Sequence, residues 1–185
     1  MSPRRLVASA AALPVFLAAG VWTGLGGAGL GTESAAPTGF TARLNGAQEV
    51  PRPKGVKAAA QGTFTAALVR SGAGGTLSWK LTFQGLSGKA TASHIHVGAR
   101  GRAGGVKLSL CGPCRSGARG TAKVDAKTVN ALLAGSTYVN VHTTRNAAGE
   151  IRGQIAKTAK PPPLPSPPTT TNATTAGTTT DDPYP

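Results

Sequence analysis

The sequence predicts an all-β domain: a Greek-key, immunoglobulin-like sandwich or barrel with one short helix near its C-terminal hairpin. Two patterns lead to this prediction. Short runs of alternating apolar and polar residues fill residues 40–156, and glycine-rich turns separate these runs. The region holds roughly 115 residues, which is enough to bury a core of its own.

Strands are expected wherever this alternation is clear. Residues 76–83 are the best case, because four large apolar side chains alternate there with polar ones. Trp79 and Phe83 belong to this row, so we expect them in the core rather than on a ligand platform. The run should form a hairpin with residues 62–69. The basic segment that ends at Val124 carries no expected element. The other expected strands are residues 40–44, 92–98, 106–110, 138–143 and 150–155.

One stretch, residues 125–135, breaks the β pattern. Val129, Leu132 and Leu133 have helical spacing within it. Asp125 can cap the N-terminus of a helix, and Gly135 can end it. We therefore predict one short helix before the strand at residues 138–143.

Both ends of the chain differ in composition from the domain, which we place at residues 37–157. Residues 1–36 carry Arg4 and Arg5 near their start, followed by a long uncharged run. This pattern predicts an export signal. An uncleaved membrane anchor is the alternative, but the glycine-rich second half of the run favours cleavage and no stable membrane span. The proline- and threonine-rich residues 158–185 predict a disordered tail. We expect a secreted or cell-envelope protein.

The charge of the domain is strongly positive. Between residues 40 and 157, 17 Lys and Arg side chains stand against three acids, Glu49, Asp125 and Glu150. Such a field attracts polyanions without selecting among them. The basic residues are scattered singly and few aromatic residues accompany them, so nucleic acid is not the expected partner. An anionic cell-surface polymer or a protein partner fits better.

The three histidines have matched positions on two expected strands. His94 and His96 point to one face of their strand, and Ile95 and Val97 point to the other, buried face. His142 has the same outward position in residues 138–143. If the two strands are neighbours, three imidazoles converge into a surface site for copper or, alternatively, zinc. The competing interpretation is that the histidines hydrogen-bond across strands and hold the sheet together.

Three further polar residues could support such a site. Glu49 and Glu150 lie near strand edges, where either could be a fourth ligand or accept an imidazole N–H. The alternative that we favour is a salt bridge, for example with Arg152. Asn140, two residues before His142, could orient a ligand or a pair of strands.

Cys111-Gly-Pro-Cys114 has the tetrapeptide of the thioredoxin active site. A thioredoxin needs a βαβ unit around this tetrapeptide, and the flanking sequence predicts none. In an exported chain the pair predicts a small-loop disulfide. A redox role and copper capture by reduced thiols are the alternatives.

Six blocks in order resemble the CHRD domain, named after chordin. This resemblance spans about residues 40–156, implies an exported module and brings no agreed biochemical activity. The blocks are residues 48–51 (Gln-Glu-Val-Pro), 86–88 (Leu-Ser-Gly), 94–98 (His-Ile-His-Val-Gly), 133–135 (Leu-Ala-Gly), 138–143 (Tyr-Val-Asn-Val-His-Thr) and 149–154 (Gly-Glu-Ile-Arg-Gly-Gln).

The CHRD domain is in turn similar to copper/zinc superoxide dismutases, which are Greek-key β-barrels. That likeness implies that His94 and His96 match two copper ligands and that His142 matches another. The bridging histidine and the zinc-site histidines have no counterpart here, so dismutase activity is not expected. The leading hypothesis is a non-enzymatic binding module with a copper site, and the alternative is a mononuclear copper redox enzyme.

Overall fold

Nine strands form one antiparallel sheet in the computed structural model, which describes residues 36–163. The predicted signal lies almost entirely outside the described residues, as does the tail from residue 164 onward. Within residues 36–163, no helix has the length and apolar character needed to cross a membrane. In chain order the elements are β1 (Thr38–Asn45), η1 (Gly46–Gln48), β2 (Gln61–Ser71), β3 (Gly74–Gln84), β4 (Ala90–Val97), β5 (Val106–Cys111), β6 (Ala118–Val124), α1 (Ala126–Leu133), β7 (Thr137–Thr143), β8 (Ile151–Gln154) and β9 (Ala156–Thr158).

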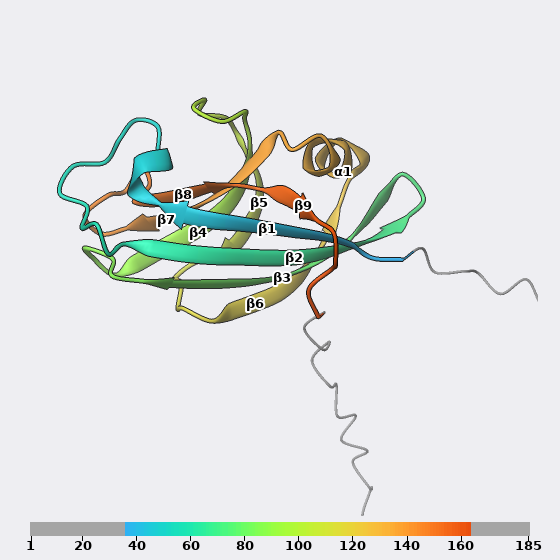
Figure 1. Ribbon diagram of the computed structural model, residues 1–185, viewed down its shortest axis with the longest axis horizontal. Helices are drawn as coiled ribbons and strands as arrows, with labels where there is room; N and C mark the ends of the chain where they lie inside the picture. Colours follow the sequence, from blue (N-terminus) through green and yellow to red (C-terminus); the bar gives the residue numbers. More distant parts are fainter. Residues whose placement is uncertain (1–35, 164–185) are drawn as a thin grey trace, which may run out of the picture. The chain divides into compact units, whose positions relative to one another are not determined.

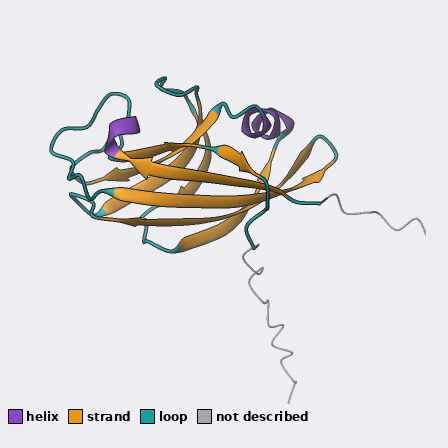
Figure 2. Cartoon of the chain, viewed as in Figure 1, coloured by secondary structure: helices purple, strands orange, loops and turns teal. Residues whose placement is uncertain are grey.

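The sheet curls into a nearly closed barrel with Greek-key connections. Its strand order is β5-β4-β7-β8-β1-β2-β3-β6, and β9 pairs with β1. Figure 1 shows β1, β2 and β3 running side by side along one face. β3 pairs with β6 and β4 with β7, and each of these pairs skips two strands of the chain. Strands make up most of the domain, with α1 and η1 outside the sheet (Figure 2). The predicted fold class is confirmed.

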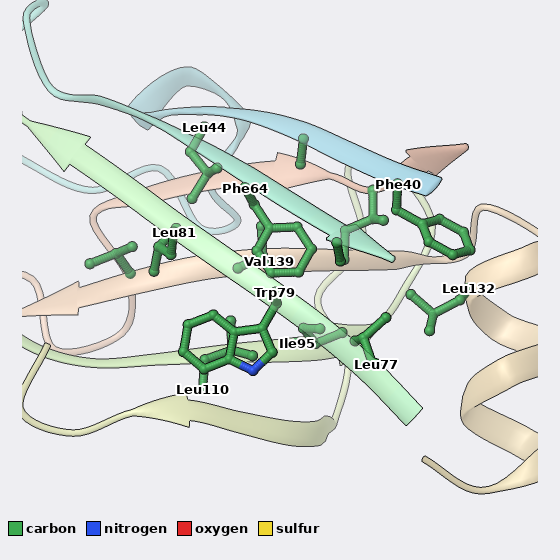
Figure 3. Close-up of a cluster of buried hydrophobic side chains, with 14 of the residues drawn as sticks. Phe40, Leu44, Phe64, Leu77, Trp79, Leu81, Ile95, Leu110, Leu132 and Val139 are labelled. Atoms are coloured by element: carbon green, nitrogen blue, oxygen red, sulfur yellow. The ribbon is translucent and has the colours of Figure 1, made fainter. Parts of the chain in front are cut away.

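Apolar side chains from alternate strand positions fill the barrel (Figure 3). Trp79 is buried, as predicted, whereas Phe83 is half-buried and packs against the edge of the core. The fully buried aliphatic and aromatic side chains include Phe40, Leu44, Phe64, Leu68, Leu77, Leu81, Ile95, Val139 and Ile151.

The predicted hairpin and helix are both present. β2 and β3 pair without interruption from Gln61 opposite Gln84 to the turn. Asp125 caps α1 by accepting a hydrogen bond from the Thr128 amide at 2.8 Å. Gly135 follows the helix with φ of +68°, a conformation that suits glycine after a helix end.

The sequence pattern did not predict two of the strands, β6 and β9. The inward positions of β6 are mostly small, so its alternation is weak. Gly120 shows why: a Cβ there would lie 2.8 Å from the indole of Trp79. β9 reaches Thr158, one residue past the predicted domain boundary, and adds a short edge beside β1.

Candidate metal centre

Three imidazoles from neighbouring strands converge on the sheet face opposite Ile95. His94 and His96 belong to β4 and His142 to β7, and these strands are paired, as the matched positions predict. One nitrogen of each ring lies within 4.8 Å of the other two. His94 Nδ1 is 3.0 Å from His142 Nε2. Metal–nitrogen bonds of about 2.0–2.1 Å place donor atoms roughly 3–3.5 Å apart. This pair already has that spacing.

The ring of His96 lies farther away than the other two. Its centroid is 5.8 Å from that of His94 and 6.4 Å from that of His142, whereas the latter two centroids are 4.9 Å apart. A three-nitrogen site therefore needs only a small inward movement of one ring. The residue types and their spacing fit one ion with open coordination positions.

Backbone carbonyls decide which ring nitrogens carry protons. Gly104 O lies 2.8 Å from His96 Nδ1, and Ala147 O lies 2.9 Å from His142 Nδ1. A carbonyl oxygen only accepts, so each Nδ1 donates and the neutral ring keeps its lone pair on Nε2. His94 Nδ1 then donates to His142 Nε2. Two rings are thus held in the tautomer that offers Nε2 as a ligand.

His96 is buried rather than on the surface, which corrects one sequence-based expectation. Only 8 % of the residue is exposed, because residues 98–105 fold back over it. Gly104 permits this close approach, since a Cβ there would overlap the carbonyl oxygen of Val97. The other two histidines are half-buried. The parity argument placed the side chain outside the core, but it could not foresee the loop that covers it.

Burial lowers the pKa of both β4 histidines. For His94, burial is the largest cause, and the neighbouring rings of His142 and His96 add to it. For His96, burial again dominates, while its hydrogen bond to Gly104 acts in the opposite direction. Both rings are therefore neutral at neutral pH, which is the form that binds metal ions.

Asn140 lies between His96 and Glu49. Its amide group lowers the pKa of Glu49 and opposes the lowering of the His96 pKa, so it acts on both side chains. Glu49 is 5 % exposed. Burial raises the pKa of Glu49 to about 7, although a hydrogen bond from the backbone amide of Val50 and the charge of Arg152 act to lower this pKa. Gly149 packs directly against Glu49 Oε1, where a Cβ would collide. Glu49 thus adjoins the centre through Asn140.

Glu150 holds turns together instead of serving an imidazole or pairing with Arg152. Its carboxylate accepts hydrogen bonds from the Ser87 amide at 2.6 Å, the Ser87 hydroxyl at 2.8 Å and Thr143 Oγ1 at 2.6 Å. Asn146 Nδ2 donates a fourth at 3.3 Å. Burial raises the Glu150 pKa, but these bonds outweigh burial and leave the pKa below its ordinary value. The carboxylate thereby holds the turn at Asn146. The carbonyl of the next residue, Ala147, orients His142 on β7.

The CHRD domain profile matches residues 40–155, more than half of the chain. The chain belongs to the CHRD family. Comparisons with curated proteins and with solved structures gave no significant match. The further likeness to superoxide dismutases, which none of these comparisons tests, stays a prediction.

In this CHRD domain, one buried arginine lies beside the centre, whereas the sequence predicted for it only a salt bridge with Glu49 or Glu150. Arg152 is 1 % exposed, and its guanidinium carbon lies 3.3 Å from the ring centroid of Tyr138. Tyr138 also stacks on His96, with centroids 4.8 Å apart and planes 7° from parallel. Arg152 Nη2 donates to the carbonyls of Ala99 and Arg102 at 3.1 and 2.9 Å. The arginine therefore anchors the loop that covers the centre.

The two cysteines of the CHRD domain form the predicted disulfide. Their sulfurs are 2.10 Å apart. The bridge closes the turn between β5 and β6, and the Cys114 amide donates to the carbonyl of Ala90 at 3.2 Å. Because bonded sulfurs are not thiolate ligands, the three imidazoles are the clustered metal donors among the described residues.

Proposed function

We propose that this CHRD domain is a binding module that holds one copper ion through His94 Nδ1, His96 Nε2 and His142 Nε2. The observation that carries the proposal is the unpaired ring nitrogen His96 Nε2. This atom is buried and makes no hydrogen bond within residues 36–163; the Asn140 amide lies near the ring without completing one. A buried lone pair without a partner is costly, and a metal ion would satisfy it.

The donor set supports copper ahead of zinc. Three neutral imidazoles suit both ions, and neither thiolates nor carboxylates lie in the cluster to favour another metal. For such a set, intrinsic affinity follows the Irving–Williams order, in which Cu(II) exceeds Zn(II). Copper should therefore displace zinc at equal free concentrations.

The test is a copper titration of the full chain, purified without a polyhistidine tag and stripped of metal. We expect one equivalent of tightly bound Cu(II), with nitrogen hyperfine structure in the electron paramagnetic resonance spectrum. The variant His94→Ala/His96→Ala/His142→Ala should lose that equivalent. Asn130→Ala, an exposed change on α1, is the control and should bind like the wild type. Equal uptake by the triple variant and the control would refute the site.

Zinc, which is diamagnetic, can identify the ligand atoms by NMR of the imidazole nitrogens. Before zinc is added, His94 should be protonated on Nδ1, because it donates to His142 Nε2. After zinc is added, the proton should reside on His94 Nε2, whereas His96 and His142 keep theirs on Nδ1. A change of tautomer at His96 would contradict the assignment, since Gly104 O needs the Nδ1 proton.

We also propose that the protein acts outside the cytoplasm and engages an anionic surface polymer or protein through its basic faces. The supporting observation is a pair of positive side chains on the outer face of the sheet, where Lys80 on β3 lies opposite Arg119 on β6. Binding of this kind should weaken steeply with salt. Retention of the full chain on a sulfated polysaccharide column, compared with Lys80→Gln/Arg119→Gln, tests it. A variant that elutes at the wild-type salt concentration would exclude this face.

A further inference from the structure

The three donor nitrogens of the histidine cluster are unevenly spaced. His94 Nδ1 and His142 Nε2 are 3.0 Å apart, whereas the set of three nitrogens extends to 4.8 Å. The wider separation involves His96, whose ring centroid lies farther from the other two than they lie from each other. The cluster is therefore a narrow pair with one donor set apart, and it is not an equal triangle.

Zinc and copper(II) need different spacings of their donors. Around a tetrahedral zinc ion, bonds of about 2.0–2.1 Å place every pair of nitrogens about 3.4 Å apart. Around a tetragonal copper(II) ion with bonds of the same length, neighbouring nitrogens are about 2.9 Å apart and opposite ones about 4.1 Å apart. The narrow pair matches the neighbouring spacing around copper(II). The widest separation must shrink by about 0.7 Å for copper(II) but by about 1.4 Å for zinc.

His96 is the ligand that is held most firmly against such a movement. Its ring stacks on Tyr138, with centroids 4.8 Å apart and planes 7° from parallel. Its Nδ1 donates to Gly104 O at 2.8 Å. The ring of His94 is half-buried, and among the described residues its one hydrogen bond is to His142. A large shift of His96 toward the pair would slide its ring off Tyr138 and stretch the bond to Gly104.

Tyr138 is itself fixed on several sides. The guanidinium carbon of Arg152 lies 3.3 Å from the ring centroid of Tyr138. Arg152 in turn donates to the carbonyls of Ala99 and Arg102. The Tyr138 hydroxyl donates to Gly104 O at 3.3 Å and accepts from the Gly104 amide at 3.1 Å. Tyr138 is 4 % exposed, and close-packed buried groups of this kind resist displacement.

We propose that Tyr138, held by Arg152, makes the three-histidine site prefer copper(II) to zinc more strongly than the intrinsic affinities of the two ions require. This inference rests on the metal site proposed above and assigns the origin of its selectivity. Tyr138 is a positioning residue, because it acts through the ring of His96. The stack keeps that ring at a spacing which a tetragonal ion accepts and a tetrahedral ion does not.

The test is chelator competition with Cu(II) and Zn(II) on the full, untagged chain, stripped of metal. Tyr138→Leu removes the stacking ring, so the ratio of the zinc to the copper(II) dissociation constant should fall at least tenfold. Tyr138→Phe keeps the ring, and its ratio should stay within threefold of the wild type. An unchanged ratio in Tyr138→Leu, with both ions bound, would overturn the inference and leave the metal site standing. A wild type that takes up no copper would refute both.

Phe40→Leu is the matched control for loss of a buried aromatic ring. Phe40 is fully buried on β1 and lies outside the histidine cluster. The control should lower the free energy of unfolding and leave the ratio of the two dissociation constants unchanged. An equal fall of this ratio in Phe40→Leu and Tyr138→Leu would assign the effect to general loosening of the fold and overturn the inference.

The metal-free chain offers a second readout, which is exchange of the His96 Nδ1 proton with water, measured by NMR. Gly104 O accepts this proton, and the stack on Tyr138 holds the ring that carries it. Exchange should therefore be at least tenfold faster in Tyr138→Leu than in the wild type, and within threefold of the wild type in Tyr138→Phe. Equal exchange in all three proteins would show that the ring is held without the stack, contrary to the inference.

Discussion

Replacing Glu49 by Gln tests the most perturbed carboxyl group of the domain. Burial raises the folded-state pKa of Glu49 from 4.5 to about 7. Below pH 4.5 the carboxyl is protonated in both the folded and the unfolded chain. As the pH rises to 7, the unfolded chain loses this proton first, so ionisation favours unfolding. The wild type should therefore lose stability across this window.

The size of the effect follows from the shift. One pKa unit corresponds to about 1.4 kcal/mol, so the shift amounts to about 3 kcal/mol. Glutamine does not ionise, and Glu49→Gln should escape this loss. The difference in unfolding free energy between the variant and the wild type should move by about 3 kcal/mol in the variant's favour from pH 4 to pH 8.

The assay is urea denaturation followed by circular dichroism at several pH values. Comparing the two proteins cancels the titration of the histidines, which is common to both. Glu150→Gln provides a control of opposite sign: the Glu150 pKa is lowered, so its stabilisation exists above pH 4.5 and is lost as the pH falls. The gap between wild type and Glu150→Gln should close in acid. Parallel profiles of wild type and Glu49→Gln would refute the reasoning.

Three further substitutions should affect stability by different routes, each measurable by urea denaturation. Gly149→Ala should destabilise the fold by about 2 kcal/mol, because φ is +137° and the new Cβ collides with Glu49; a neutral effect would contradict that packing. Phe64→Ala should cost about 3–5 kcal/mol through a core cavity, and a loss below 1 kcal/mol would contradict full burial. Cys111→Ser/Cys114→Ser should cost about 2 kcal/mol through loop entropy and leave copper uptake unchanged; lost uptake would implicate the cysteines.

Alternation of apolar and polar residues was enough to predict the all-β class, the central hairpin and the shared face of the three histidines. It failed at β6, where small inward residues make room for Trp79 and weaken the pattern. It also failed to predict the burial of Arg152. No local pattern marks an arginine for burial, because its partners are carbonyls more than 45 residues away in the chain.

By itself, the sequence determined the parity of each side chain on its strand, since that depends only on position along the chain. Tertiary structure alone decided which carbonyls meet His96 and His142. Every residue has a carbonyl group, so Gly104 and Ala147 carry no signal as acceptors until the loops fold. The same holds for the cleft that Glu49 and Arg152 line together, because these two residues are far apart in the sequence. Side-chain direction is a local property, whereas burial and the pairing of polar atoms depend on long-range contacts.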